Sequence, residues 1–155
     1  MASTLITSNL KVKIIESINL NGQNQGASNT LTIPSVATIS KRIVDVPASE
    51  VEIIAMSTAV ASGTFIESDV RYIRITNLDD TNHVTLTFKD EDATEFAVKL
   101  DKGQSFIYNA DLSGGVVDTM HAGGSALTVS LNDLVNVTAL ADTAACDLEV
   151  FVASA

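Results

Sequence analysis

The feature that most constrains this chain is the alternation of polar and apolar residues between Asp69 and Tyr108. Residues 71–76, 83–89 and 95–100 each alternate, and acidic, amide or glycine residues separate them. A period of two is that of a β-strand with one buried face. We therefore expect a β-meander here, with one face in the core and the other in solvent.

The apolar members of this alternation are the expected core positions. Val, Ile and Thr, the β-branched residues that favour strands, supply 45 of the 155 residues. Phe96→Ala is expected to cost roughly 3 to 5 kcal/mol if the ring is fully buried. The predicted core of the meander is Ile73, Ile75, Val84, Leu86, Phe88, Phe96, Val98 and Leu100.

Short strands are expected on both sides of the meander, and no strand–helix alternation is seen. Ile14-Ile15 breaks the first alternation and predicts burial on both faces or a bulge, and Pro34 predicts an edge or the end of a strand. Glycine-containing segments at 21–29 and 111–125 predict flexible loops. The further expected strands are 10–20, 30–33, 37–46, 51–56, 126–131, 134–140 and 147–153. The whole pattern predicts a single all-β domain over residues 1–155, an antiparallel sandwich of jelly-roll type.

Composition narrows the possible partners. The formal net charge of -10 argues against binding to nucleic acid. No apolar run approaches the roughly 20 residues that cross a bilayer, and the first ten residues lack a signal-peptide pattern, so we expect no membrane contact and synthesis in the cytoplasm. Charged residues are 18% of the chain and mean hydropathy is +0.27. Two explanations of this low charge and positive hydropathy remain open. Either a permanent subunit interface, as in a homo-oligomer, covers apolar surface, or abundant Ala and Val are tightly packed inside the domain.

The search for chemistry returns few candidates. His83 and His121 stand in no metal-binding spacing, and the lone Cys146 has no signature of an activated thiol. Gly114-Gly115 and Gly123-Gly124 are not followed by the residues of a phosphate loop, and Asn136-Val137-Thr138 reads as a strand segment. We expect no enzyme activity, no catalytic residues, no cofactor and no metal.

One acidic run leaves an alternative open. The segment 90–95, Asp90-Glu91-Asp92-Ala93-Thr94-Glu95, reads either as a solvated hairpin turn or as a weak calcium site. It lacks the order of an EF-hand loop. We expect a turn.

A resemblance to a known group of proteins adds a functional expectation. The blocks Lys41-Arg42-Ile43-Val44-Asp45-Val46-Pro47, Gly63-Thr64-Phe65-Ile66 and residues 69–80 resemble small structural proteins of tailed phages of aquatic bacteria, cyanophages especially. The likeness covers roughly residues 40 to 108 and, weakly, residues 147–152. It implies a virion component without enzymatic activity, with the major capsid protein or other virion proteins as partners, and defines no functional residues.

Three function classes follow from the sequence. The first is a virion structural protein, a capsid cement or decoration subunit or else a neck or tail component. The second is a carbohydrate- or receptor-binding β-sandwich, which the absence of Trp disfavours. The third is a small β-fold enzyme, for which no site is evident.

Overall fold

The computed structural model describes residues 5–121 and 130–155, and these residues form strands without any helix. Within that part of the chain, no helix is long and apolar enough to span a membrane. The strands are β1 (Ser8–Ile15), β2 (Asn19–Leu20), β3 (Gln23–Asn24), β4 (Ser28–Val36), β5 (Thr38–Val46), β6 (Val51–Ser57), β7 (Phe65–Ile66), β8 (Val70–Asn77), β9 (Val84–Asp90), β10 (Glu95–Leu100), β11 (Ser105–Asn109), β12 (Leu134–Ala141) and β13 (Cys146–Ser154).

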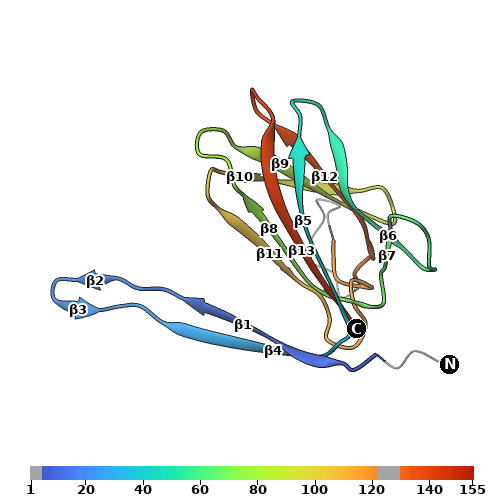
Figure 1. Ribbon diagram of the computed structural model, residues 1–155, viewed down its shortest axis with the longest axis horizontal. Coiled ribbons are helices and arrows are strands. Elements are labelled where there is room, and N and C mark those ends of the chain that lie inside the picture. The colour runs from blue at the N-terminus through green and yellow to red at the C-terminus, as the bar shows by residue number, and fades with distance from the viewer. Residues whose placement is uncertain (1–4, 122–129) are drawn as a thin grey trace.

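Eight strands form two facing sheets with jelly-roll connectivity. One sheet has the order β11-β8-β13-β5, and the other has the order β10-β9-β12-β6, extended by the short parallel strand β7. The antiparallel pairs are nested: β5 lies beside β13, β6 beside β12, β8 beside β11 and β9 beside β10. Figure 1 shows this sandwich with a thin ribbon of chain outside it. The expected all-β sandwich is confirmed.

The core lies between the two sheets and is filled with aliphatic and aromatic side chains. Phe88 is fully buried, with ring centroids 5.0 Å from Phe96 and 4.9 Å from Phe106. Phe96 and Val98 are only half-buried because β10 is the edge strand of its sheet. The other predicted core positions are confirmed as buried: Ile73, Ile75, Val84, Leu86, Phe88 and Leu100.

The predicted meander is wrong in its connectivity. β8 belongs to one sheet and β9 to the other, so residues 78–83 cross between sheets, and only β9 and β10 form a hairpin. Buried Asn77 fastens this crossing, because its Nδ2 donates to the carbonyl oxygens of Asn82 (2.9 Å) and Leu100 (3.2 Å). Alternation predicted which side chains point inward but not which sheet receives them.

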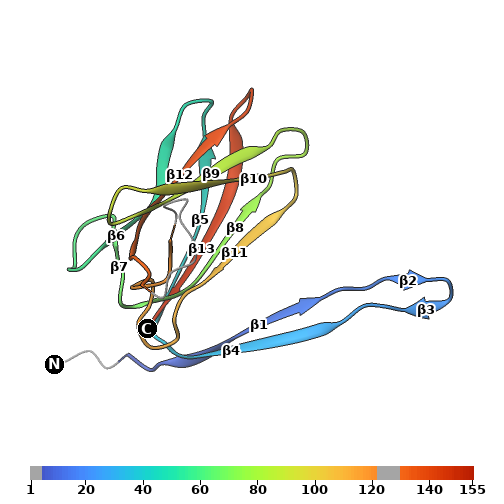
Figure 2. The ribbon, with the colours of Figure 1, turned by 180° about the vertical axis from the view of Figure 1, so that it is seen from behind.

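The first strands form an arm, residues 8–36, outside the sandwich. β1 pairs with β4, and β2 pairs with β3. The two pairs share one register across a gap at residues 16–18 and 25–27, where backbone hydrogen bonds join Glu16 to Ala27 and Gln25 to Ile18. Figures 1 and 2 show this two-stranded ribbon leaving one end of the sandwich and diverging from it. Extended chain from Ser8 to Leu20 spans roughly 40 Å at about 3.3 Å per residue.

The expected flexible loop at 21–29 is wrong. Asn21 and Gly22 alone make the turn, with φ of 52° and 79°, and two successive positive φ values are those of a type I′ hairpin turn. Residues 23–24 and 28–29 lie in β3 and β4. Asn-Gly is a strong hairpin signal, and it was available in the sequence.

Strand β4 continues through Pro34 because the arm has a bulge at its root. The register shifts between Ser8 and Leu10, opposite Pro34 and Ser35, and Ser35 has a φ of 59°. A bulge residue needs no N–H in the ladder, so a proline is tolerated there. Ile14-Ile15 has neither a bulge nor double burial: the two side chains are 45% and 64% exposed.

The second expected loop, 111–125, lies partly outside the described residues. Its described part is held by two isolated bridges, Asp111 with Gly115 and Met120 with Asn132. The expected strand at 126–131 falls mostly outside the described residues as well.

Candidate interaction surface

The side chains that could carry chemistry are scattered. His83 Nδ1 lies 3.5 Å from Asp142 Oδ2 beside the start of β9, and His121 is exposed. Cys146 is buried in the core, where burial raises the pKa of its thiol and so disfavours the reactive thiolate. The structure brings none of these three candidates together.

The acidic run 90–95 is organised as a hairpin turn around one buried carboxylate. Asp90 is 1% exposed, and it accepts hydrogen bonds from the backbone N–H of Asp92 and Thr94, from the Thr94 hydroxyl, and from Asn132 Nδ2 at 2.9 Å. Burial opposes ionisation of Asp90, but these donors outweigh it and hold the pKa of the carboxyl below its ordinary value. Asp90 thus serves as the internal acceptor of the turn.

Within residues 5–121 and 130–155, no group of three or more His, Cys, Asp or Glu side chains is arranged so that it could hold a metal ion. The expected absence of a metal stays a prediction. Gly115 belongs to a tight turn, in which Asp111 Oδ1 accepts from the N–H of Ser113 and Gly114. Gly123-Gly124 lies outside the described residues. Asn136 is in β12, where its Nδ2 donates to Glu52 Oε2 at 3.0 Å.

The arm carries an apolar face that strand alternation defines. Even-numbered residues from Leu10 to Leu20 lie on one side of the ribbon, and the odd-numbered residues opposite them on the returning strand share that side. The other side holds Lys11, Lys13, Thr30 and Thr32, with Ile15 as the large apolar exception. We call the apolar side the arm stripe, made of Leu10, Val12, Ile14, Ile18, Leu20, Leu31 and Ile33.

The root of the arm stripe packs on its own sandwich. Ile33 is fully buried and forms a second apolar cluster with Tyr72 and Ala153, against which Leu10, Val12, Leu31, Ile107 and Phe151 pack. Tyr72, Ile107, Phe151 and Ala153 alternate with core residues on their strands, so they lie on the outer face of the β11-β8-β13-β5 sheet. Tyr72 is 4% exposed because the arm covers it. The arm therefore has a fixed root.

The far half of the arm stripe is only partly covered by the described residues. Ile14 is 45% exposed, Ile18 47% and Leu20 54%, in contrast to the buried Ile33 nearer the root. Figures 1 and 2 show the ribbon moving away from the sandwich toward this end. A two-stranded hairpin without a packed face is at best marginally stable in water. This half of the stripe is the strongest candidate for a contact with another molecule.

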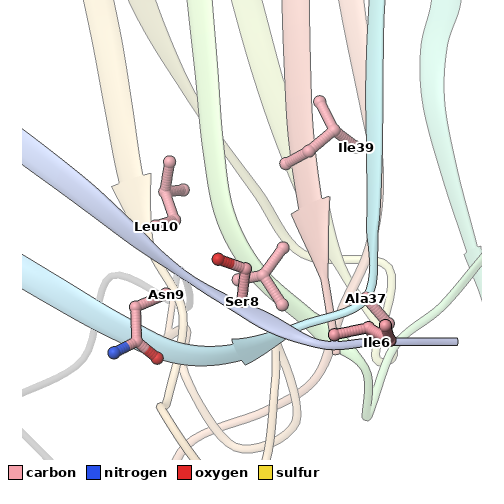
Figure 3. Close-up of a pocket in the computed structure, with 7 residues that line it drawn as sticks. Ile6, Ser8, Asn9, Leu10, Ala37 and Ile39 are labelled. Carbon is pink, nitrogen blue, oxygen red and sulfur yellow. The ribbon is translucent and has the colours of Figure 1, made fainter.

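A shallow groove lies at the root of the arm, where the chain passes from β4 to β5. It is lined by Ile6, Ser8, Asn9, Leu10, Val36, Ala37 and Ile39, none of which is charged. Figure 3 shows Leu10 and Ile39 rising on the same side of the chain, with Ile6 beside Ala37. Ile6 is 90% and Ile39 50% exposed, and Ile43 on the same face of β5 is 63% exposed. We call this the root groove.

Charge divides the molecule into two unequal parts. Up to residue 37 the chain holds two lysines and one glutamate, a net charge of +1, while the remainder has 7 Lys and Arg against 18 Asp and Glu, a net charge of -11. The sandwich therefore repels other copies of itself, whereas the arm does not repel a sandwich.

The sequence contains the pattern that forms the arm stripe. Leu10, Val12 and Ile14 recur at every second position before the Asn21-Gly22 turn. They were interpreted as one ordinary strand, because alternation alone does not tell whether a strand joins the main sheets or leaves them.

Comparisons with known proteins supply no family. No protein-family model matches the chain, and no curated protein matches it. Among solved structures it is similar to a chain of Bacillus endospore appendages, described as a novel family of disulfide-linked pili. The two are 14% identical, the match covers 99% of this chain and 91% of that chain, and the TM-score is 0.41. A likeness this distant carries no argument about what this chain does.

Proposed function

We propose that this chain is a non-enzymatic structural subunit, held in a larger assembly by its arm. The observation that carries the proposal is the uncovered half of the arm stripe, with Ile14, Ile18 and Leu20 about half exposed on a ribbon outside the sandwich. Burying such side chains stabilises an association by about 25 cal/mol per Å² of apolar surface removed from water. A neighbouring subunit that covers the stripe would also stabilise the ribbon itself.

The specific form of the proposal is a subunit of a phage virion, because of the resemblance of residues 40–108 to virion proteins of tailed phages. A cement subunit would sit on the capsid shell in many copies and clamp the major capsid protein, with the rigid sandwich as its body and the arm as its grip. Small contacts repeated by symmetry add up to a strong attachment. A neck or tail position is the alternative within the same class.

Carbohydrate binding is the weaker candidate. Jelly rolls also build lectins, so the fold alone does not choose between the two. Sugar sites generally use an exposed aromatic ring, and none of the two Tyr and five Phe of this chain is exposed. The uncovered surface of the arm is aliphatic, as suits contacts with protein.

Quantitative mass spectrometry of purified particles from the source tests the virion proposal. A cement subunit should be present in many copies per particle, and heads that lack it should assemble but open sooner under heat or low salt. A copy number of about a dozen or fewer, expected of a ring at a symmetric neck or tail, would favour the alternative. Absence from particles would overturn the virion assignment.

A matched pair of variants tests the role of the arm in the assembly. Ile18→Ser with Leu20→Ser removes apolar surface from the stripe, whereas Val60→Ser removes an 87% exposed apolar side chain elsewhere. Particles should take up the arm variant poorly and the Val60 variant normally. Equal uptake of the two would contradict a role for the arm.

A further inference from the structure

The structure points to a second copy of this chain as the partner of the arm. We propose that the uncovered half of the arm stripe in one copy docks in the root groove of another. This proposal rests on the proposed function, since it names the molecule that covers the stripe.

The chemistry of the root groove suits the stripe. The groove has no charged lining, and its apolar residues include Ile6, Leu10, Val36 and Ile39, two of which are at least half exposed. Ile43 is a further exposed apolar side chain on the same outer face of β5, with Lys41 between it and Ile39. Ser8 and Asn9 are the polar members of the lining, so a row of aliphatic side chains would meet a mainly apolar surface there.

A copy cannot fill its own groove. Leu10 lines the groove, and Leu20 lies ten residues further along the same ribbon, roughly 33 Å away at about 3.3 Å per residue. In both views the ribbon runs outward from the sandwich without folding back onto it (Figures 1 and 2). The uncovered half of the stripe and the groove thus lie toward opposite ends of the arm, and we expect them to meet only between molecules.

Charge favours the same pairing. Two sandwiches, each at -11, repel, but the arm at +1 can approach the acidic sandwich of another copy. Beside Ile43 that sandwich presents Asp45 and Asp147, which face each other across β5 and β13 and are both exposed. Lys11 and Lys13 lie on the side of the ribbon opposite the arm stripe, so they contribute to the net charge of the arm and not to the face that docks. An arm-to-groove contact is therefore favoured over a contact between two sandwiches.

The contact between stripe and groove is compatible with a closed dimer or with a longer assembly. If two copies exchange arms reciprocally, both stripes and both grooves are covered in a symmetric dimer. If the contact runs one way, a free stripe and a free groove remain at the ends, and copies add into a ring or a chain. The same residues meet in either case, so the first test concerns the contact and not the number of subunits.

Sedimentation analysis of the purified chain tests self-association. The wild type should associate, and Ile18→Ser with Leu20→Ser should weaken association by at least about tenfold, which corresponds to about 1.4 kcal/mol. Val60→Ser is the matched control and should associate like the wild type. Near-ultraviolet circular dichroism and the unfolding midpoint of each variant verify that the sandwich is intact. A wild-type chain that stays monomeric at its highest soluble concentration would overturn the proposal.

Cysteine pairing between separately made variants tests the register of the contact. Leu20→Cys mixed with Ile39→Cys should give an intermolecular disulfide under mild oxidation, because bridged Cα atoms must come within about 7 Å. The natural Cys146 is buried and should not react. Leu20→Cys mixed with Val60→Cys is the control and should give no such product. A disulfide that forms as readily with Leu20→Cys alone would place two arm tips together and overturn the groove assignment.

The two proposals fail in different ways. If the purified chain is monomeric but the arm variant still enters particles poorly, the arm engages a different protein, so self-association is wrong and the structural role stands. If the chain associates through stripe and groove but is absent from particles, self-association stands and the virion assignment is wrong.

Discussion

The sandwich and the arm use the same strand pattern, but their apolar faces end in different surroundings. In the sandwich, the inward faces of two sheets meet, and Leu86 and Val150 are 0% and 2% exposed. In the arm, the same kind of alternating face is covered only near its root, and Leu20 is 54% exposed. Alternation specifies that a face is apolar and leaves open what covers it. The exposed part of the arm stripe is the surface that we propose a partner covers.

The largest expected effect is in the sandwich. Phe88→Ala removes a fully buried ring that contacts Phe96, Phe106 and Tyr108, and should lower the free energy of unfolding by about 3–5 kcal/mol. Phe96→Ala should cost less, because that ring is half-buried. Urea unfolding followed by circular dichroism measures both, since the chain has no Trp.

The arm supplies the control for that prediction. Ile18→Ala should change the free energy of unfolding of the isolated chain by less than about 0.5 kcal/mol, as expected of an exposed side chain. If Phe88→Ala and Ile18→Ala had similar effects, the division into a packed sandwich and a half-covered arm would be wrong.

Two glycines allow the same substitution to be made in each region. A Cβ at Gly115 would lie 2.1 Å from the carbonyl oxygen of Glu67, and Gly115 has a φ of 73°, so Gly115→Ala should lower the free energy of unfolding by about 2–4 kcal/mol. A Cβ at Gly26 would lie 2.0 Å from the carbonyl oxygen of Glu16, within the arm. Gly26→Ala should therefore distort the arm and leave the urea midpoint of the sandwich nearly unchanged.

Hydrogen exchange separates the two outcomes residue by residue. In Gly26→Ala, amides of β1 and β4 should lose protection, whereas those of β8 and β13 should keep it. A matching loss in both regions would show that arm and sandwich unfold as one unit and that the arm is not an independent element.

The buried carboxylate of the acidic turn gives the next effect. Asp90→Asn replaces an acceptor of several hydrogen bonds by a group that also carries donors, and should cost about 1–3 kcal/mol. The natural Asp90 has a pKa below its ordinary value in the folded protein. Its contribution to stability is therefore complete above the unfolded-state pKa and is lost as the pH falls toward the folded-state pKa.

Acid titration of the unfolding midpoint measures this contribution. The wild type should lose stability below about pH 4, the ordinary range of an Asp side chain, and Asp90→Asn should lose less over the same interval. Thr94→Val is a companion variant, because it removes one donor to Asp90 and should move the pH profile in the same direction by a smaller amount. Equal pH profiles for all three proteins would contradict the assigned role.

Features of the structure that depend on neighbours in the sequence were predicted, whereas features that depend on contacts between distant residues were not. Inward-facing residues such as Ile73 and Leu86 follow from neighbours two positions away, and their burial was predicted correctly. β9 joins the other sheet across a turn that Asn77 stabilises through its hydrogen bonds to Asn82 and Leu100, and alternation contains no such information. The arm was predicted as a strand and a loop, because the cover over Tyr72 is a long-range contact that no local pattern shows.

The smallest expected effect on stability gives the sharpest test of the arm stripe. Ile14 and Ile15 are neighbours on β1 and are 45% and 64% exposed, but they lie on opposite faces of the ribbon. Ile14→Thr and Ile15→Thr keep a β-branched side chain and should each change the free energy of unfolding by less than about 0.5 kcal/mol. Sedimentation should nevertheless distinguish them: Ile14→Thr should weaken association, and Ile15→Thr should leave it unchanged, although Ile15 exposes the larger fraction. If Ile15→Thr had the greater effect, the polar face of the arm would be the one that meets the partner, and exposed apolar surface would matter more than the face that carries it.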